Sequence, residues 1–308
     1  MKWSLLFILV LLCGPSSAQE IRKELRYQGL ERSYYVHSPR GWDGKTPLPL
    51  VLLLHGGGGG AQQALKSYPL GPVADREGFL LVAPNGTGPL RREILRTWNV
   101  GWGFGYAQRN HVDDLGFVRA LILQLTRDYP VDRARVYLTG LSNGAILSHY
   151  AGAANSDLVT GIAPVVGCAG GGESSQLTYP SAPQRPLNVI MFNGGLDRHI
   201  PLNGGVQELH SEDQARQVCS AQESARFWVN ANGCKPTPTV EELPEQKATR
   251  YTWTGGRQNT RVVLWVLHNQ GHAWPGGQAP RASSDQPTPL VKAHEVLWQF
   301  FRDQAEGR

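Results

Sequence analysis

The chain has few cysteines and no marked excess of charge of one sign. Four cysteines occur in 308 residues, which excludes a small fold held together by several disulfide bonds. Lysine and arginine number 30 against 25 aspartates and glutamates, for a formal net charge of +5. The basic residues are dispersed and often stand beside acids, as in "DREG" and "TRDYPVDRAR", which favours a solvated surface. We therefore expect no nucleic acid among the partners.

Long hydrophobic runs are missing beyond the N-terminus. The first residues, "MKWSLLFILVLLCGPSSAQE", combine a positive charge at Lys2, an apolar stretch over 5–12 and small residues up to Ala18. The stretch is too short to span a bilayer, and this order is typical of a secretory signal peptide. We predict a signal peptide over 1–18 and a secreted chain, periplasmic or extracellular, with no membrane span. A buried N-terminal helix or a lipid anchor on Cys13 fits the residues less well.

The rest of the chain, 19–308, contains no linker or internal repeat that would divide it, so we predict a single domain. Apolar runs such as "LPLVLLLHG", "FLLVAPN", "RVYLTG" and "LNVIMFNGG" alternate with helical segments, one of them expected around 64–76. A hairpin-like segment, "LRYQGLERSYYVHSP", precedes them. This pattern predicts an α/β fold with a mostly parallel central sheet, an N-terminal antiparallel hairpin and helices on both faces.

A serine stands between two glycines where a strand-like run becomes a helix-like one. The segment is "VYLTGLSNGAILSHY", with Ser142 between Gly140 and Gly144. The spacing G-x-S-x-G at such a joint is typical of a nucleophile elbow, in which the glycines leave room for a sharp turn. Ligands of parallel sheets bind at the carboxyl ends of the strands, which is where this serine stands.

A serine hydroxyl needs a base to become a nucleophile, and the base needs an acid to orient it. Asp197 follows the run "LNVIMFNGG" and His272 follows "TRVVLWVLHN", in the chain order Ser, Asp, His of this architecture. We therefore predict Ser142, Asp197 and His272 as the catalytic residues. His199 and His268, in the same two loops, are the nearest rivals for the base.

An oxyanion formed by attack of the serine would need two hydrogen-bond donors. One is expected from the backbone N–H of Asn143, the residue after the serine. The other is expected from the glycines of "LLLHGGGGGAQQ", with Gly57 preferred and Gly58 as the alternative. A phosphate-binding loop is disfavoured because no Gly-Lys-Ser/Thr follows. His55, at the start of the loop, is expected to be structural.

Aromatic residues near these loops are candidates for substrate binding. Trp274 stands two residues after the predicted base, and Trp98 and Trp102 belong to the loop "TWNVGWGFGY". Their rings are suited to lining a pocket or stacking on a substrate. The alternative is that they pack the loop onto the domain.

The segment "HVDDLGF" suggests a metal site formed by His111, Asp113 and Asp114. Acids in the first turn of a helix are favoured by the helix dipole, and no second cluster of ligands accompanies them. Helix capping is therefore the preferred interpretation. We expect no metal and no other cofactor.

The cysteines beyond Cys13 allow at most one internal disulfide. Ser220 and Glu223 form a capping box that begins a helix between Cys219 and Cys234. At ~1.5 Å per residue this helix would hold the two thiols more than ~10 Å apart. Any bridge is therefore expected to include Cys168, paired with either of the other two.

Six motifs, "HGGGGG", "TWNVGWGFGYAQRNHVDDLGFVRAL", "TGLSNGA", "FNGGLDRHIPLNGG", "GHAWPGG" and "VLWQFF", occur in this order. Together they resemble the polyhydroxybutyrate depolymerase-like esterase family, related to feruloyl and acetylxylan esterases, over nearly all of 19–308. The resemblance implies an α/β-hydrolase fold and a metal-free serine esterase with Ser142, Asp197 and His272 as its triad. Family members often carry cysteines at positions where this chain has none, so the disulfide pattern of the family is not transferred.

The function favoured by these predictions is hydrolysis of carboxylic esters through an acyl-enzyme. The expected partner is a small-molecule, oligomeric or polymeric ester, with hydroxyalkanoate oligomers as the first substrate class. Feruloyl or acetyl esters of plant polysaccharides are the alternative. Two further hypotheses are a peptidase, which in this fold commonly has a large extra domain, and a catalytically silent binding protein on a hydrolase scaffold.

Overall fold

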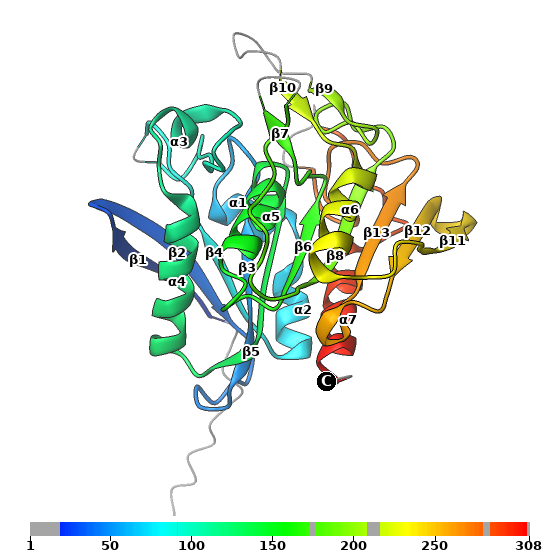
Figure 1. Cartoon of the computed structure of the whole chain (residues 1–308). Helices are drawn as coiled ribbons and strands as arrows, with labels where there is room; N and C mark the ends of the chain where they lie inside the picture. The colour runs from blue at the N-terminus through cyan, green and yellow to red at the C-terminus, as the bar shows by residue number, and fades with distance from the viewer. Residues whose placement is uncertain (1–18, 91, 173–175, 208–215, 280–283, 307–308) are drawn as a thin grey trace, which may run out of the picture.

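A central sheet of ten strands organises the protein. The computed structural model describes residues 19–90, 92–172, 176–207, 216–279 and 284–306, so the predicted signal peptide lies outside the described residues. The strand order is β1-β2-β4-β3-β5-β6-β8-β13-β12-β11 (Figure 1). The central strands are mutually parallel: β3 (Leu48–Leu54), β4 (Leu80–Pro84), β5 (Val131–Leu141), β6 (Gly161–Val165), β8 (Asn188–Gly194) and β13 (Val262–Leu267).

Antiparallel hairpins form both edges of the sheet. The predicted N-terminal hairpin, β1 (Gln19–Tyr27) and β2 (Leu30–Ser38), lies beside β4 and is confirmed. The opposite edge consists of β12 (Ala248–Trp253) and β11 (Thr239–Leu243), which the sequence did not predict. Strand β11 reads "TVEEL" and is largely exposed, so it lacks the apolar run that identified the central strands.

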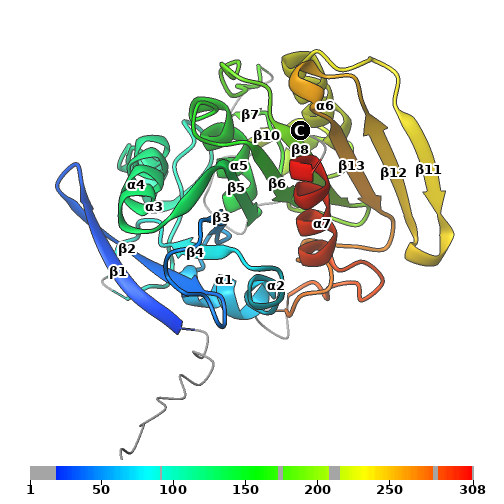
Figure 2. The same cartoon turned by 90° about the horizontal axis from the view of Figure 1, so that it is seen from below.

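Helices cover both faces of the sheet, and the predicted fold class is confirmed (Figure 2). Each face has its own hydrophobic cluster, since the sheet separates the two layers of apolar side chains. One face carries α1 (Ala61–Ser67), α2 (Leu70–Glu77) and α7 (Ala293–Glu306), and the other α4 (Asp114–Asp128), α5 (Asn143–Ala154) and α6 (Ala221–Asn232). The short helix α3 (Gly105–Arg109) and a small sheet of β7 (Gly171–Gly172), β10 (Arg216–Val218) and β9 (Gly205–Gln207) lie beyond the carboxyl ends of the central strands (Figure 1).

The helix predicted around 64–76 is two helices, α1 and α2, with Pro69 between them. A proline pushes the residue before it towards extended backbone, and Tyr68 has φ −113° and ψ 96°. The prediction of one continuous helix was therefore wrong. The interruption directs the ring of Tyr68 into the pocket described below.

A buried ion pair joins the N-terminal hairpin to α4. Arg32 Nη2 donates to Asp114 Oδ1 at 2.6 Å, and the side chains are 1% and 0% exposed. The other carboxylate oxygen accepts the backbone N–H of Asn99 at 2.8 Å, and the guanidinium lies 3.8 Å from the ring centroid of Phe117. Burial raises the pKa of the Asp114 carboxyl, and the guanidinium opposes that rise.

The substitution Arg32→Ala is expected to lower the free energy of unfolding by about 3–5 kcal/mol, because it leaves a buried carboxylate without its partner. Urea denaturation followed by circular dichroism measures the change. Arg135→Ala is the matched control, since its ion pair with Asp132 is 38% and 29% exposed, and its loss is expected to cost no more than about 1 kcal/mol. Equal losses in the two variants would contradict the role given to the buried pair.

Candidate active site

Ser142 occupies a strained turn between β5 and α5. Its φ of 56° and ψ of −118° are rare for a residue with a side chain, and such strain persists where the surroundings fix the backbone. Here the Ser142 N–H donates to Val165 O at 3.1 Å. A Cβ at Gly140 or at Gly144 would clash with the backbone oxygen of Leu54. The two glycines are therefore required by the close approach of β3, as the elbow pattern predicted.

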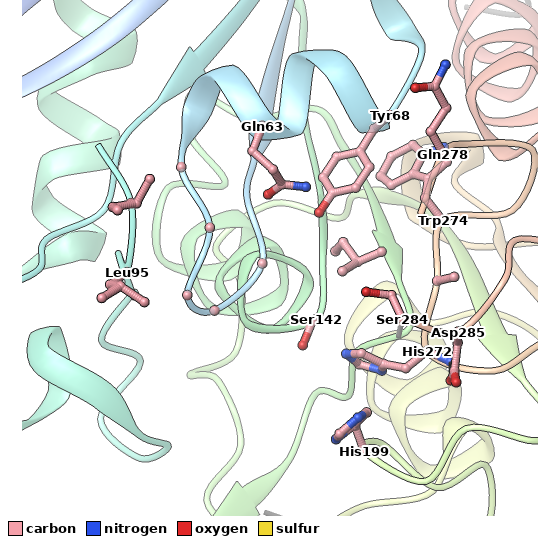
Figure 3. Close-up of a pocket in the computed structure, with 18 residues that line it drawn as sticks. Gln63, Tyr68, Leu95, Ser142, His199, His272, Trp274, Gln278, Ser284 and Asp285 are labelled. Atoms are coloured by element: carbon pink, nitrogen blue, oxygen red, sulfur yellow. Dashed lines mark hydrogen bonds between the residues drawn. The ribbon is translucent and has the colours of Figure 1, made fainter. Parts of the chain in front are cut away.

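The Ser142 side chain faces a pocket of about 640 Å³. His272 and the glycines 56–60 also line it. Figure 3 shows Ser142 and the His272 ring among the side chains that line the pocket. The pocket lies at the carboxyl ends of β3, β5 and β13, as expected for a parallel sheet.

Asp197 fixes the orientation of the His272 ring. Its Oδ2 lies 2.8 Å from His272 Nδ1, and its side chain is 1% exposed. Its Oδ1 accepts the backbone N–H groups of His199 and Ile200, each at 2.8 Å. Because a carboxylate only accepts hydrogen bonds, Nδ1 carries the proton and Nε2 has a free lone pair. The structure thus brings together the two loops from which the acid and base were predicted.

The other histidines of the described residues differ in their surroundings. Burial lowers the pKa of His55 to about 4, and its Nε2 accepts the Gly86 N–H at 2.9 Å, so it is a neutral structural residue as expected. His149 is buried as well, with its pKa lowered to about 3, and accepts the indole N–H of Trp228. His268 bonds to a threonine of β12.

His199, the nearest rival for the base, does line the pocket. Its ring centroid lies 4.8 Å from that of His272, edge to face. The Asp197 carboxylate accepts the backbone N–H of His199 but bonds to the ring of His272. The orientation of the two rings therefore favours His272.

The two residues predicted to stabilise an oxyanion through their backbone N–H groups are Asn143 and Gly57. Asn143 is the first residue of α5, and the first N–H groups of a helix have no acceptor within it. Its side chain is held by the backbone of Trp98, through bonds of 2.7 and 3.1 Å. Gly57 and Gly58 both line the pocket, but the Gly58 N–H is already bonded to Arg96 O at 2.8 Å. Gly57 therefore remains the better candidate for the second donor.

Of the three predicted aromatic residues, only Trp274 lines the pocket. It is buried and stacks on Tyr68, with centroids 4.7 Å apart and planes 12° apart. Trp98 and Trp102 are buried elsewhere, where Trp98 donates to His55 O and Trp102 donates to the hydroxyl of Tyr150. The structure thus gives these two rings the packing role that was the alternative interpretation.

Several pocket residues carried no signal in the sequence. Ile94 and Leu95 lie in the loop after β4, and Asp285 accepts the backbone N–H of His272. None of them belongs to a recognisable motif, and the loop after β4 has no periodicity. Only the structure places them beside the serine.

Two of the three side chains considered as metal ligands, Asp113 and Asp114, have other roles. The side chain of Asp113 accepts the Gly116 N–H and caps α4, as the preferred interpretation expected, while Asp114 pairs with Arg32. Within the described ranges, no three His, Cys, Asp or Glu side chains are grouped so that they could hold a metal ion. Within the same ranges, no helix has the length and apolar character needed to cross a membrane.

Similarity to known proteins extends along most of the chain, although no family model matches it. The chain is 26% identical over 279 residues to the putative esterase NocK of Nocardia uniformis subsp. tsuyamanensis, a match that covers 86% of this chain and 77% of that protein. It is also 26% identical over 253 residues to feruloyl esterase B of Piromyces equi, covering 80% of this chain but only 44% of that enzyme. The chain is a carboxylic ester hydrolase.

The solved structure of the acetyl xylan esterase from Aspergillus awamori has the same fold as this esterase. The two superpose with a TM-score of 0.59 at 13% identity, over 93% of this esterase and 99% of that chain. At this identity the likeness shows the fold alone. The resemblance inferred from the six sequence motifs is thus confirmed, since the similar proteins are named esterases and the fold is that of an esterase.

Proposed function

We propose that the esterase is a serine hydrolase with Ser142 as nucleophile, His272 as general base and Asp197 as the residue that orients the base. The observation that carries the proposal is the 2.8 Å bond between His272 Nδ1 and Asp197 Oδ2 beside the pocket that Ser142 lines. This bond holds the proton on Nδ1. The lone pair of Nε2 is then available to accept the proton of the Ser142 hydroxyl.

In the first step, Ser142 Oγ attacks the ester carbonyl while its proton passes to His272 Nε2. The negative charge on the carbonyl oxygen is stabilised by the N–H groups of Asn143 and Gly57, which stay aligned because their backbones are held in place. The tetrahedral intermediate collapses, His272 donates the proton to the leaving alcohol, and the acyl group remains on Ser142.

In the second step, water replaces the alcohol. His272 takes a proton from the water as it attacks the acyl-enzyme, and the same two N–H groups stabilise the second oxyanion. Collapse releases the carboxylic acid, and the proton returns from His272 to Ser142. Buried Asp197 stabilises the positive charge on the imidazolium in both steps.

For the substrate, we propose hydroxyalkanoate oligomers. We also propose that the enzyme is exported, that residues 1–18 are removed as a signal peptide, and that it meets its substrate outside the cytoplasm. The pocket wall is largely apolar, and Ile94 and Leu95 at its mouth are each 49% exposed. An exposed apolar rim suits a chain of short aliphatic units that extends beyond the pocket.

Feruloyl or acetyl esters of polysaccharides are the second candidate, because several similar proteins are named feruloyl or acetylxylan esterases. The stacked pair of Tyr68 and Trp274 provides a flat aromatic wall that suits a planar acyl group. A peptidase has no comparable observation in its favour.

The test treats the protein with a fluorophosphonate and measures hydrolysis of hydroxybutyrate oligomers, methyl ferulate and acetylated xylan before and after. We expect one adduct per chain, on the peptide that contains Ser142, and loss of all ester hydrolysis. A label on another serine, or hydrolysis that survives complete labelling, would overturn the proposal. The ratio of the initial rates decides between the two substrate classes.

A further inference from the structure

Two cysteines that take no part in the proposed chemistry lie close to each other. Cys168 stands in the loop after β6, and Cys219 directly precedes α6. Both are buried, and each thiol is the neighbour with the largest effect on the pKa of the other. Cys234 follows the far end of α6, so the helix separates it from Cys219, as its capping box predicted.

Two hydrogen bonds join Gly170 to Cys219, one donated by each residue. The Cys219 N–H donates to Gly170 O at 2.9 Å, and the Gly170 N–H donates to Cys219 Sγ at 3.1 Å. Ser224 Oγ lies 3.1 Å from the same sulfur and accepts the Ala169 N–H at 3.0 Å. The segment after Cys168 is thus bonded directly to Cys219 and to the first turn of α6, which brings the two cysteines close together.

The two thiols differ in acidity. The hydrogen bond from Cys168, together with those from Ser224 and the Gly170 N–H, lowers the pKa of Cys219 to about 7. The same contact and burial raise the pKa of Cys168. Thiol–disulfide exchange starts from a thiolate, so Cys219 is the thiol of the pair better suited to begin it.

We propose that Cys168 and Cys219 form an intramolecular disulfide by exchange with a small organic disulfide while the chain folds, before the two thiols are buried. The Cys219 thiolate attacks one sulfur of the organic disulfide, which forms a mixed disulfide and releases one thiolate. Cys168 then attacks the Cys219 sulfur and gives its proton to the released thiolate, while the second organic sulfur leaves as a thiolate and takes up the proton that Cys219 had lost. Two protein thiols are oxidised to one disulfide, and one organic disulfide is reduced to two thiols.

The disulfide would join the loop after β6 to the start of α6. It closes a segment of roughly 50 residues that includes β8 and Asp197, and a loop of this length constrains the unfolded chain substantially. Asp197 is held in place by its own backbone hydrogen bonds. We therefore expect the bridge to raise stability and to leave ester hydrolysis nearly unchanged. The proposal does not depend on the assignment of the nucleophile.

The test refolds the full chain in a buffer of oxidised and reduced glutathione, and in a parallel sample with reductant only. Free thiols are then alkylated in denaturant, and the chain is digested without reduction and analysed by mass spectrometry. We expect a linked peptide that joins Cys168 to Cys219, with Cys234 alkylated. The oxidised sample should have a Tm roughly 5–10 °C higher than the reduced one.

Three variants make the result specific. Cys234→Ser should keep both the linked peptide and the difference in Tm between the oxidised and reduced samples. Cys168→Ala and Cys219→Ala should each abolish that difference in Tm. Both of these variants should still hydrolyse p-nitrophenyl esters. A linkage that includes Cys234, or complete alkylation of Cys168 and Cys219 after oxidative refolding, would overturn the proposal.

Discussion

The substitution Ser142→Ala is expected to reduce kcat/KM for short-chain p-nitrophenyl esters by at least about 10⁴-fold, since no other group replaces the attacking hydroxyl. The protein should remain folded, because the turn is fixed by the Val165 carbonyl and by Gly140 and Gly144 rather than by the serine side chain. Initial rates measure the loss, and circular dichroism with thermal melting checks the fold.

The matched control for this substitution is Ser181→Ala, which changes an exposed serine far from the elbow in sequence. It should have native kcat/KM and native Tm. If the Ser142 variant hydrolysed the esters at the native rate, a different nucleophile would have to be sought.

The second large effect is expected from Asp197→Asn, which should lower kcat by roughly 10³–10⁴-fold with little change in KM. The backbone N–H groups of His199 and Ile200 require an acceptor at Oδ1, so the amide oxygen of D197N takes that place and its NH₂ faces His272. Nδ1 must then accept, which places the imidazole proton on Nε2. An Nε2–H cannot take the proton of Ser142.

Initial rates at varied substrate concentration, measured across a range of pH, give kcat and KM separately and so measure this effect. Asp157→Asn is a matched control because Asp157 pairs with Arg119 at the surface, with exposed fractions of 32% and 42%. It should leave both constants unchanged. A loss of less than tenfold in D197N would contradict the orienting role given to Asp197.

The parallel strands and the loops that follow them could be predicted from the sequence because local patterns determine them. Apolar runs buried on both faces identified β3, β4, β5 and β8, and the spacing of Gly140, Ser142 and Gly144 identified the turn. The chain order Ser, Asp, His of this architecture then directed the search for the acid and the base to the loops after β8 and β13. The structure brings Asp197 and His272 from these two loops into contact.

Features that depend on packing could not be predicted. Trp98 and Trp102 look like pocket residues in the sequence, but their indole N–H groups bond to His55 O and the Tyr150 hydroxyl, so both rings are drawn into the core. Tyr68 reaches the pocket only because Pro69 ends α1. The partner of Asp114 is an arginine 82 positions away, a separation over which sequence patterns carry no information.

The walls of the pocket and the proposed catalytic groups are held by different means. Ser142, Asp197 and Asn143 are each fixed by backbone hydrogen bonds or by the closeness of neighbouring strands, whereas Ile94 and Leu95 project half-exposed from a loop. Exchange of residues in that loop can therefore alter which compounds enter while leaving the reaction itself intact. Divergence of selectivity among descendants of this scaffold, or its redirection by mutagenesis, should begin at those two positions.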